Sequence, residues 1–170
     1  MAGSNVLVVF YSRTGTTEKV AQALAAELGA EAEEVIDTKP RSGPIGFARS
    51  GKDAILKKST QIRETTHDPS AFDLVLVGTP VWAGSVTPAI RTYLEENREG
   101  LTRPVFFLTT ASSGIDHTFR QMGEICGKEP LATFSLLTRE IKKGEHEDKV
   151  RAFAEHVRHE LLAEPPEEDA

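Results

Sequence analysis

Residues 8–24 read VVFYSRTGTTEKVAQAL, and this stretch holds the end of an apolar run, a hydroxyl-rich loop and an amphipathic segment in direct succession. The apolar run, Val6–Tyr11, has no polar face, which is typical of a strand buried on both sides of a parallel sheet. From about Thr16 to Leu28, apolar side chains recur at helical spacing, and Gly29 follows where helices commonly end. The stretch therefore predicts one strand–loop–helix unit of an α/β fold.

The same alternation of strand and helix patterns continues along the remaining chain. Further strands are predicted at Glu31–Ile36, Leu74–Thr79, Val105–Thr109 and Ala132–Leu137, and further helices at Phe47–Lys58, Thr87–Asn97, Asp116–Cys126 and Glu147–Leu162. A loop containing Pro40, Gly43, Pro44 and Gly46 is expected before the first of these helices. We therefore predict an open, doubly wound parallel sheet of five strands with helices on both faces.

Length and composition limit the classes of protein to consider. At 170 residues, we expect one domain over residues 1–163 and an acidic, disordered tail at 164–170. No apolar stretch approaches the roughly 20 residues that cross a bilayer, and no signal-peptide pattern is present, so we expect a cytoplasmic protein without membrane insertion. Cys126 is the single cysteine, which excludes an intramolecular disulfide and a Cys-x-x-Cys pair. His156 and His159 have no third ligand beside them, and no metal site is predicted.

The loop after the first strand is suited to an anion. A turn at its glycine can direct backbone N–H groups into one concavity, the following helix adds its dipole, and short hydroxyls supply further donors. We therefore predict that a phosphate monoester binds to Ser12, Arg13, Thr14, Gly15, Thr16 and Thr17. The alternative is an ordinary Ser/Thr-rich helix N-cap.

With this loop at its centre, the quoted stretch resembles the signature of the flavodoxin family, from the hydrophobic strand through Ser, Gly and Thr to Ala and Leu. The segment Gly78–Gly84 resembles the Gly-Thr-Pro-x-Trp-x-Gly loop of small flavodoxin-like proteins. The resemblance covers nearly the whole chain. It implies strand order 2-1-3-4-5 and tight, non-covalent binding of FMN.

Two further loops follow the strands beside the expected crevice. The ring of the flavin is predicted to lie against Thr79, Pro80, Val81, Trp82, Ala83 and Gly84, and against Thr110, Ala111, Ser112, Ser113 and Gly114. Trp82 is the only tryptophan, and its flat face could stack on the ring. The alternative is that Trp82 packs into the core. The loop 110–114 resembles the third flavin loop of the family but lacks the aromatic residue that many flavodoxins have there.

The resemblance implies electron transfer, and it leaves two functional classes open. One is a redox carrier that docks with partner proteins, and the other is an NAD(P)H-dependent quinone or flavin reductase. A weaker third alternative is a flavodoxin-like binding module without flavin. We expect a redox partner protein or NAD(P)H as the electron donor and no nucleic-acid partner. The sequence indicates neither the acceptor, the reduction potential nor the oligomeric state.

The net charge of −6 is unevenly distributed. Residues 38–63 contain seven lysines and arginines and one aspartate, a net charge of +6, and leave −12 on the rest of the chain. We call this stretch the basic segment. Because it follows the second strand, we expect it beside the opening of the crevice, where it could attract an anionic donor or an acidic partner. The alternative is a solvated helix face with no role in binding.

Overall fold

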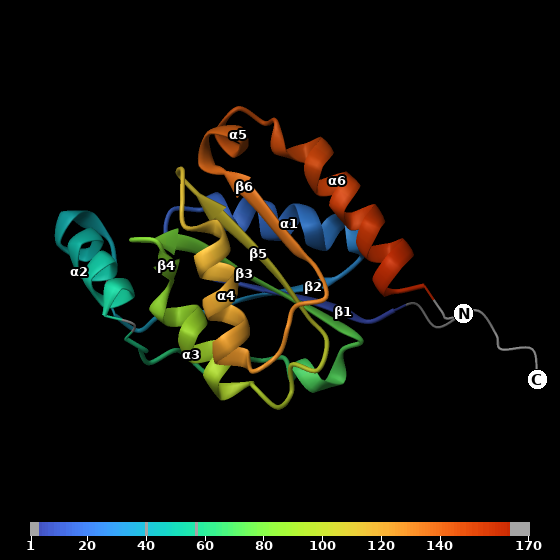
Figure 1. Ribbon diagram of the computed structural model, residues 1–170, viewed down its shortest axis with the longest axis horizontal. Coiled ribbons are helices and arrows are strands. Elements are labelled where there is room, and N and C mark those ends of the chain that lie inside the picture. The colour runs from blue at the N-terminus through green and yellow to red at the C-terminus, as the bar shows by residue number, and fades with distance from the viewer. Residues whose placement is uncertain (1–3, 40, 57, 164–170) are drawn as a thin grey trace, which may run out of the picture.

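A parallel sheet forms the centre of the computed structural model, which describes residues 4–39, 41–56 and 58–163. Five strands lie parallel in the order β2-β1-β3-β5-β6 (Figure 1). Their bounds are β1 Val6–Phe10, β2 Glu31–Glu34, β3 Leu74–Trp82, β5 Pro104–Thr110 and β6 Thr133–Leu137. This arrangement confirms the predicted doubly wound sheet and its order.

Helices cover both faces of the sheet and enclose two apolar cores. On one face, α1 (Thr16–Leu28) and α6 (His146–His156) pack over the side chains of Val6, Val8 and Phe10. On the other, α3 (Pro88–Glu96) and α4 (Ile115–Cys126) pack over Leu7, Val9 and Tyr11. Successive strand residues point to opposite faces, so β1 needs apolar residues at every position. That requirement explains its continuous apolar sequence.

The direction of winding reverses between β1 and β3, because the chain passes from β1 outward to β2 and then returns to the other side of β1. In open α/β sheets, ligands bind at the carboxyl ends of the strands next to such a reversal. These ends lie toward β4 (Ser85–Val86) and α2 (Gly43–Ile55), opposite the end of the sheet where β1 begins (Figure 1). A ligand site is therefore expected at the loops after β1, β3 and β5.

The segment after β3 differs from its prediction. The strand was expected to end at Thr79, but β3 continues to Trp82 and turns back into β4, with Trp82 paired to Ser85. The turn residues Ala83 and Gly84 have φ values of 49° and 74°. Two positive φ values are the mark of the tight type I′ hairpin turn, which matches the twist of paired strands. The predicted loop is thus partly a hairpin.

Other element boundaries also differ. Helix α2 begins at Gly43 rather than Phe47, because Pro44 falls in the first turn, where proline is tolerated. The predicted last helix, Glu147–Leu162, is α6 followed by a π-helical turn at Val157–Leu161, and a short helix that was not predicted, α5 (Thr138–Lys142), precedes it. A 3₁₀ turn, Pro69–Ala71, precedes β3. The predicted tail lies outside the described residues. Among the helices that the structure describes, none combines the length and apolarity needed to cross a membrane.

One cluster of side chains holds the segment before β3 against the edge strand β2. Glu33 of β2 is buried and accepts hydrogen bonds from the backbone N–H groups of Thr66 and His67 and from the Thr66 hydroxyl. The two ring nitrogens of His67 face carboxylate oxygens of Glu33 and Glu31. Carboxylates only accept, so this geometry favours the imidazolium, which donates from both nitrogens. The hydrogen bond to Glu33 accordingly raises the pKa of His67 above its ordinary value of 6.5.

We expect the contribution of His67 to stability to depend on pH. A raised pKa in the folded state stabilises the fold fully below the unfolded pKa of about 6.5, and this stabilisation disappears as the pH rises through the folded value. The difference in free energy of unfolding between the wild type and His67→Gln should therefore shrink from about pH 5.5 to about pH 8.5 in urea titrations. Glu31→Gln removes one carboxylate and should weaken this pH dependence. If the difference in free energy of unfolding stayed constant over this pH range, His67 would not be stabilising the fold through its charged form.

Candidate functional site

Three loops meet at the carboxyl ends of β1, β3 and β5. The hydroxyl of Thr17, at the start of α1, lies 2.8 Å from that of Thr109 near the end of β5. The turn after β3 touches the third loop so closely that a Cβ added at Gly114 would lie 2.9 Å from Gly84 Cα. The structure therefore brings together the three loops that contain the predicted site residues. All three border the switch point between β1 and β3.

The phosphate-type loop, Ser12–Thr17, has a conformation that leaves its helix end open. Gly15 occupies the N-cap of α1 with φ 92°, and no side chain caps this helix. The Ser12 hydroxyl accepts a hydrogen bond from the Gly15 N–H at 3.0 Å, which shapes the turn. The first N–H groups of a helix have no partner within the helix. The alternative of an ordinary Ser/Thr side-chain N-cap is therefore wrong.

The hydroxyls of this loop differ in how accessible they are. Thr14 is exposed, and its hydroxyl lies 3.4 Å from that of Thr16. Thr17 is buried and its hydroxyl pairs with Thr109. Arg13 points away from the helix end, donating to the carbonyl of Arg41 at 3.1 Å and covering the Phe47 ring at 5.3 Å. Thr14 is thus the accessible hydroxyl of the loop, while Arg13 links it to α2.

The third loop, Thr110–Gly114, has the same plan as the first. Gly114 is the N-cap of α4 with φ 86°, again without a side-chain cap. The Thr110 hydroxyl donates to the Ser113 carbonyl at 2.7 Å and holds the turn, while Ala111, Ser112 and Ser113 are exposed. A side chain at Gly114 would need both an unfavourable φ and space that Gly84 and Val81 occupy. Glycine is therefore required where the two loops meet.

Trp82 is half-buried at the end of β3 and contacts two side chains. Tyr11 packs edge-on against it, with ring centroids 5.4 Å apart, and the Arg41 guanidinium lies over it at 6.0 Å. Burial, and next to it the negative charge of Asp37, raises the pKa of Tyr11 to about 12, so its hydroxyl stays protonated. Thr79 and Pro80 continue the strand behind Trp82, and the Thr79 hydroxyl lies 3.0 Å from that of Thr87.

A buried ion-pair cluster next to Trp82 was not predicted. Arg41 donates to Asp37 at 3.0 Å and to Asp53 at 2.7 Å, and its side chain is only 4% exposed. Burial opposes the charge of Arg41, but its hydrogen bonds to Asp53 and Asp37 raise its pKa above the ordinary value. Against burial, Arg41 also lowers the pKa of Asp53. A signal for this cluster was present in the sequence, because Asp53 lies within the basic segment and Asp37 directly precedes it.

This cluster corrects one assumption about the basic segment. Arg41 was counted among its available cations, but it is internally neutralised, and Lys57 lies outside the described residues. Five cations remain exposed: Lys39, Arg49, Lys52, Lys58 and Arg63. As predicted, the segment lies at the crevice end of the sheet, where α2 stands beside β4 (Figure 1).

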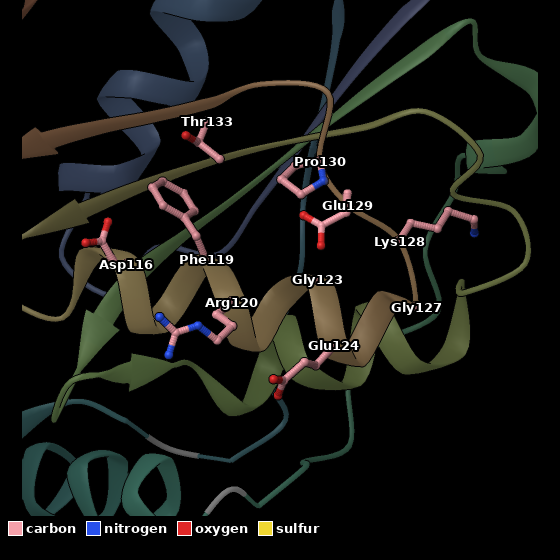
Figure 2. Close-up of a pocket in the computed structure, with 10 residues that line it drawn as sticks. All are labelled: Asp116, Phe119, Arg120, Gly123, Glu124, Gly127, Lys128, Glu129, Pro130 and Thr133. Carbon is pink, nitrogen blue, oxygen red and sulfur yellow. The ribbon is translucent and has the colours of Figure 1, made fainter.

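Several surface hollows lie near these elements. One, of about 480 Å³, lies between the first loop and α2 and is lined by Arg13, Thr14, Ser42, Gly43, Pro44 and Phe47. Another, of about 640 Å³, follows α4 away from the loops, and Phe119 points across it toward Thr133 (Figure 2). Asp116, Arg120, Glu124 and Lys128 give its rim alternating charge. The first hollow adjoins the predicted site, and a further hollow of about 840 Å³ begins at Gly15 and runs between α1 and α5.

Comparison with solved structures shows the same fold in flavoproteins. The chain is similar to a flavoprotein in complex with FMN from Lactobacillus acidophilus (23% identity over 82% of this chain and 97% of that one, TM-score 0.70). It is also similar to a flavodoxin from the domain Archaea (13% identity, 91% and 99%, TM-score 0.53). A third is the general stress protein 14 in complex with FMN from Treponema denticola (12% identity, 90% and 99%, TM-score 0.54).

Comparison with family models gives a match over most of the chain. The model described as flavodoxin matches residues 5–153, which span the three loops and all six strands. Loop conformation, strand order and this match agree, and the chain therefore belongs to the flavodoxin family.

Proposed function

We propose that this chain binds FMN non-covalently at the carboxyl ends of β1, β3 and β5 and carries electrons between partner proteins. The observation that supports it best is that three loops meet there and that two of them end in an open helix N-terminus. Helices α1 and α4, which follow the first and third loops, each have a glycine at the N-cap and no side-chain cap. Two similar flavoproteins of the same fold are described in complex with FMN. When bound, FMN supplies one- and two-electron redox chemistry.

The first loop fits the phosphate of FMN. The N-terminus of α1 presents backbone donors and a positive dipole end, and a Cβ added at Gly15 would meet no atom within 4 Å, so the turn borders open space. Thr14 adds an exposed hydroxyl, and Thr16 stands beside it. In this proposal Ser12 shapes the turn through Gly15 as well as contacting the phosphate.

The second and third loops fit the flavin ring. In this proposal Trp82 supplies an aromatic face, held by Tyr11 and Arg41, and the Ala83–Gly84 turn brings backbone groups to the ring edge. Loop 110–114 offers backbone N–H groups on the other side, where they would influence the reduction potential. The exposed residues Ala83, Ala111, Ser112 and Ser113 would leave part of the ring edge open to a partner.

The side chains of these loops favour a carrier. In residues 12–17, 79–84 and 110–114, Arg13 is the only ionisable side chain, and it bonds toward α2. The loops thus supply no acid or base for proton transfer to a bound substrate. The exposed cations of the basic segment favour the second candidate, an NAD(P)H-dependent reductase, because NADPH is strongly anionic.

Anaerobic mixing distinguishes these two candidates. The FMN-loaded protein is mixed with NADPH or NADH in a stopped-flow instrument, and flavin absorbance is followed. A carrier should stay oxidised until a catalytic amount of a flavodoxin reductase is added and should then bleach. Rapid bleaching by either nucleotide alone would overturn the carrier proposal in favour of the reductase. A protein that takes up no FMN would overturn both.

FMN binding should quench the fluorescence of Trp82. Because the chain has a single tryptophan, the emission reports this residue alone. Stacking on an isoalloxazine ring quenches indole emission, so we expect a loss of most of the signal at saturation during titration of the apoprotein. Trp82→Phe serves as the blank for direct flavin absorption. Unchanged emission while the flavin spectrum shows binding would contradict the stacked position.

A further inference from the structure

Helix α2 carries most of the exposed large apolar side chains of the described chain. Ile45, Phe47 and Leu56, the last at its C-cap, are 78%, 67% and 53% exposed. The single other case in the described residues is Leu131. Scattered exposed apolar residues are ordinary, but a concentration on one helix marks an interaction surface. The rest of this fold buries comparable side chains in its two cores.

Four exposed residues lie along one face of α2, while Phe47 is exposed on another side. Ile45, Arg49, Lys52 and Leu56 are spaced by four, three and four residues, so they lie along one side. Gly46, Ser50, Asp53 and Ala54 form the opposite, buried side. Two apolar residues thus flank two cations along about 16 Å of helix. We call Ile45, Arg49, Lys52 and Leu56 the outer face of α2.

Helix α2, which carries this outer face, stands next to the proposed flavin site. The buried ion pair between Arg41 and Asp53 fixes the helix, and Arg13 of the first loop joins it through the Arg41 carbonyl and the Phe47 ring. Phe47 also lines the hollow that begins at Thr14. A partner seated on α2 would therefore lie at the edge of the crevice, as electron transfer requires.

The geometry points to a protein with an acidic surface around an apolar centre, and we propose that such a redox partner docks on the outer face of α2. This inference rests on the proposed carrier function. Lys58, also exposed, extends the positive charge of Arg49 and Lys52, so the face complements an acidic partner. Asp37 and Asp53 do not cancel this charge, because Arg41 pairs with both and Lys39 lies 3.8 Å from Asp53, which balances the two carboxylates within the cluster.

The shape of the surface argues for a macromolecule. Small-molecule sites are concave and enclose most of their ligand. Helix α2 stands out from the sheet (Figure 1). A hollow of about 540 Å³ on its outer face is lined by Ile45, Arg49 and Lys52, but Ile45 stays 78% exposed, so the hollow would not enclose a small ligand. Weak electron-transfer complexes bury less than about 1,200 Å² in total, so one helix face and its surroundings can provide the contact.

Two double variants and a matched control test this inference. Arg49→Glu with Lys52→Glu reverses the charge, Ile45→Ser with Leu56→Ser removes the apolar contact, and Arg120→Glu with Arg139→Glu makes the same charge change at exposed positions on α4 and α5. The probe is an acidic plant-type [2Fe–2S] ferredoxin. Its reduced form gives the rate of flavin reduction by stopped flow, and its oxidised form gives a dissociation constant by calorimetry, without electron transfer.

We expect the charge-reversed variant to lose roughly tenfold or more in rate at low ionic strength and to lose its salt dependence. The apolar variant should bind the ferredoxin roughly tenfold more weakly at every ionic strength. The control should match the wild type within about twofold. Oxidation of the reduced protein by a basic c-type cytochrome should not slow in the charge-reversed variant.

Three results would overturn the inference. The α2 variants could bind the ferredoxin as the wild type does. Sedimentation could show that the apolar variant abolishes self-association of the wild type, which makes a second copy the occupant. The charge reversal could slow flavin reduction by NADPH and by no protein donor, which would make the face a nucleotide site. If the wild type exchanges electrons with neither protein, the carrier proposal fails, and the calorimetric binding still decides the docking surface.

Discussion

FMN should bind about 10- to 150-fold more weakly after Thr14→Ala, while riboflavin should bind unchanged. A hydrogen bond to a charged group contributes about 1.5–3 kcal/mol, and every 1.4 kcal/mol corresponds to a factor of ten in affinity. Thr14 suits this test because it is exposed, so its loss does not disturb the core. Thr17 is less suitable, since its hydroxyl also pairs with Thr109 inside the fold.

The measurement is a pair of titrations of apoprotein with FMN and riboflavin, followed by fluorescence. Ser112→Ala is the matched control, because it removes an exposed hydroxyl from the third loop, on the ring side of the proposed site. It should affect both ligands equally. Equal losses for FMN and riboflavin in Thr14→Ala would mean that the phosphate lies elsewhere.

Arg41→Ala should destabilise the protein by about 3–5 kcal/mol. The variant removes the cation that pairs with both Asp37 and Asp53, whose side chains are 3% and 7% exposed, and leaves only the partly exposed Lys39 at 3.8 Å from Asp53. Removing one partner of a buried pair costs the desolvation of the other, which is why the expected loss exceeds that of surface pairs. Urea titration gives the free energy, and hydrogen exchange should show the loss concentrated at α2.

Two further variants make this prediction specific. Arg49→Ala lies on the exposed side of the same helix and should change stability by no more than about 0.5 kcal/mol. Adding Asp53→Ala to Arg41→Ala should recover part of the loss, since it removes one of the stranded charges. Equal, small effects of Arg41→Ala and Arg49→Ala would contradict the buried cluster.

The sheet could be predicted from sequence because its signals are local. Runs such as Val6–Phe10 are apolar at every position only when both faces are covered, and Gly15 and Gly114 begin helices directly after strands. The phosphate loop was found for the same reason, since Ser12–Thr17 is contiguous. The β3–β4 hairpin was missed because Ala83 carries no signal for a positive φ.

The sequence by itself determined the main succession of strands and helices and the three loops, because each depends on side chains that are neighbours along the chain. The strand order followed from the resemblance to flavodoxins. Only the tertiary structure decided the state of the charges in the basic segment. Arg41 and Lys52 look alike in sequence, yet one is buried between Asp37 and Asp53 and the other faces solvent. Burial and pairing depend on how α2 packs against β3, β4 and α3, a long-range arrangement that no local pattern encodes.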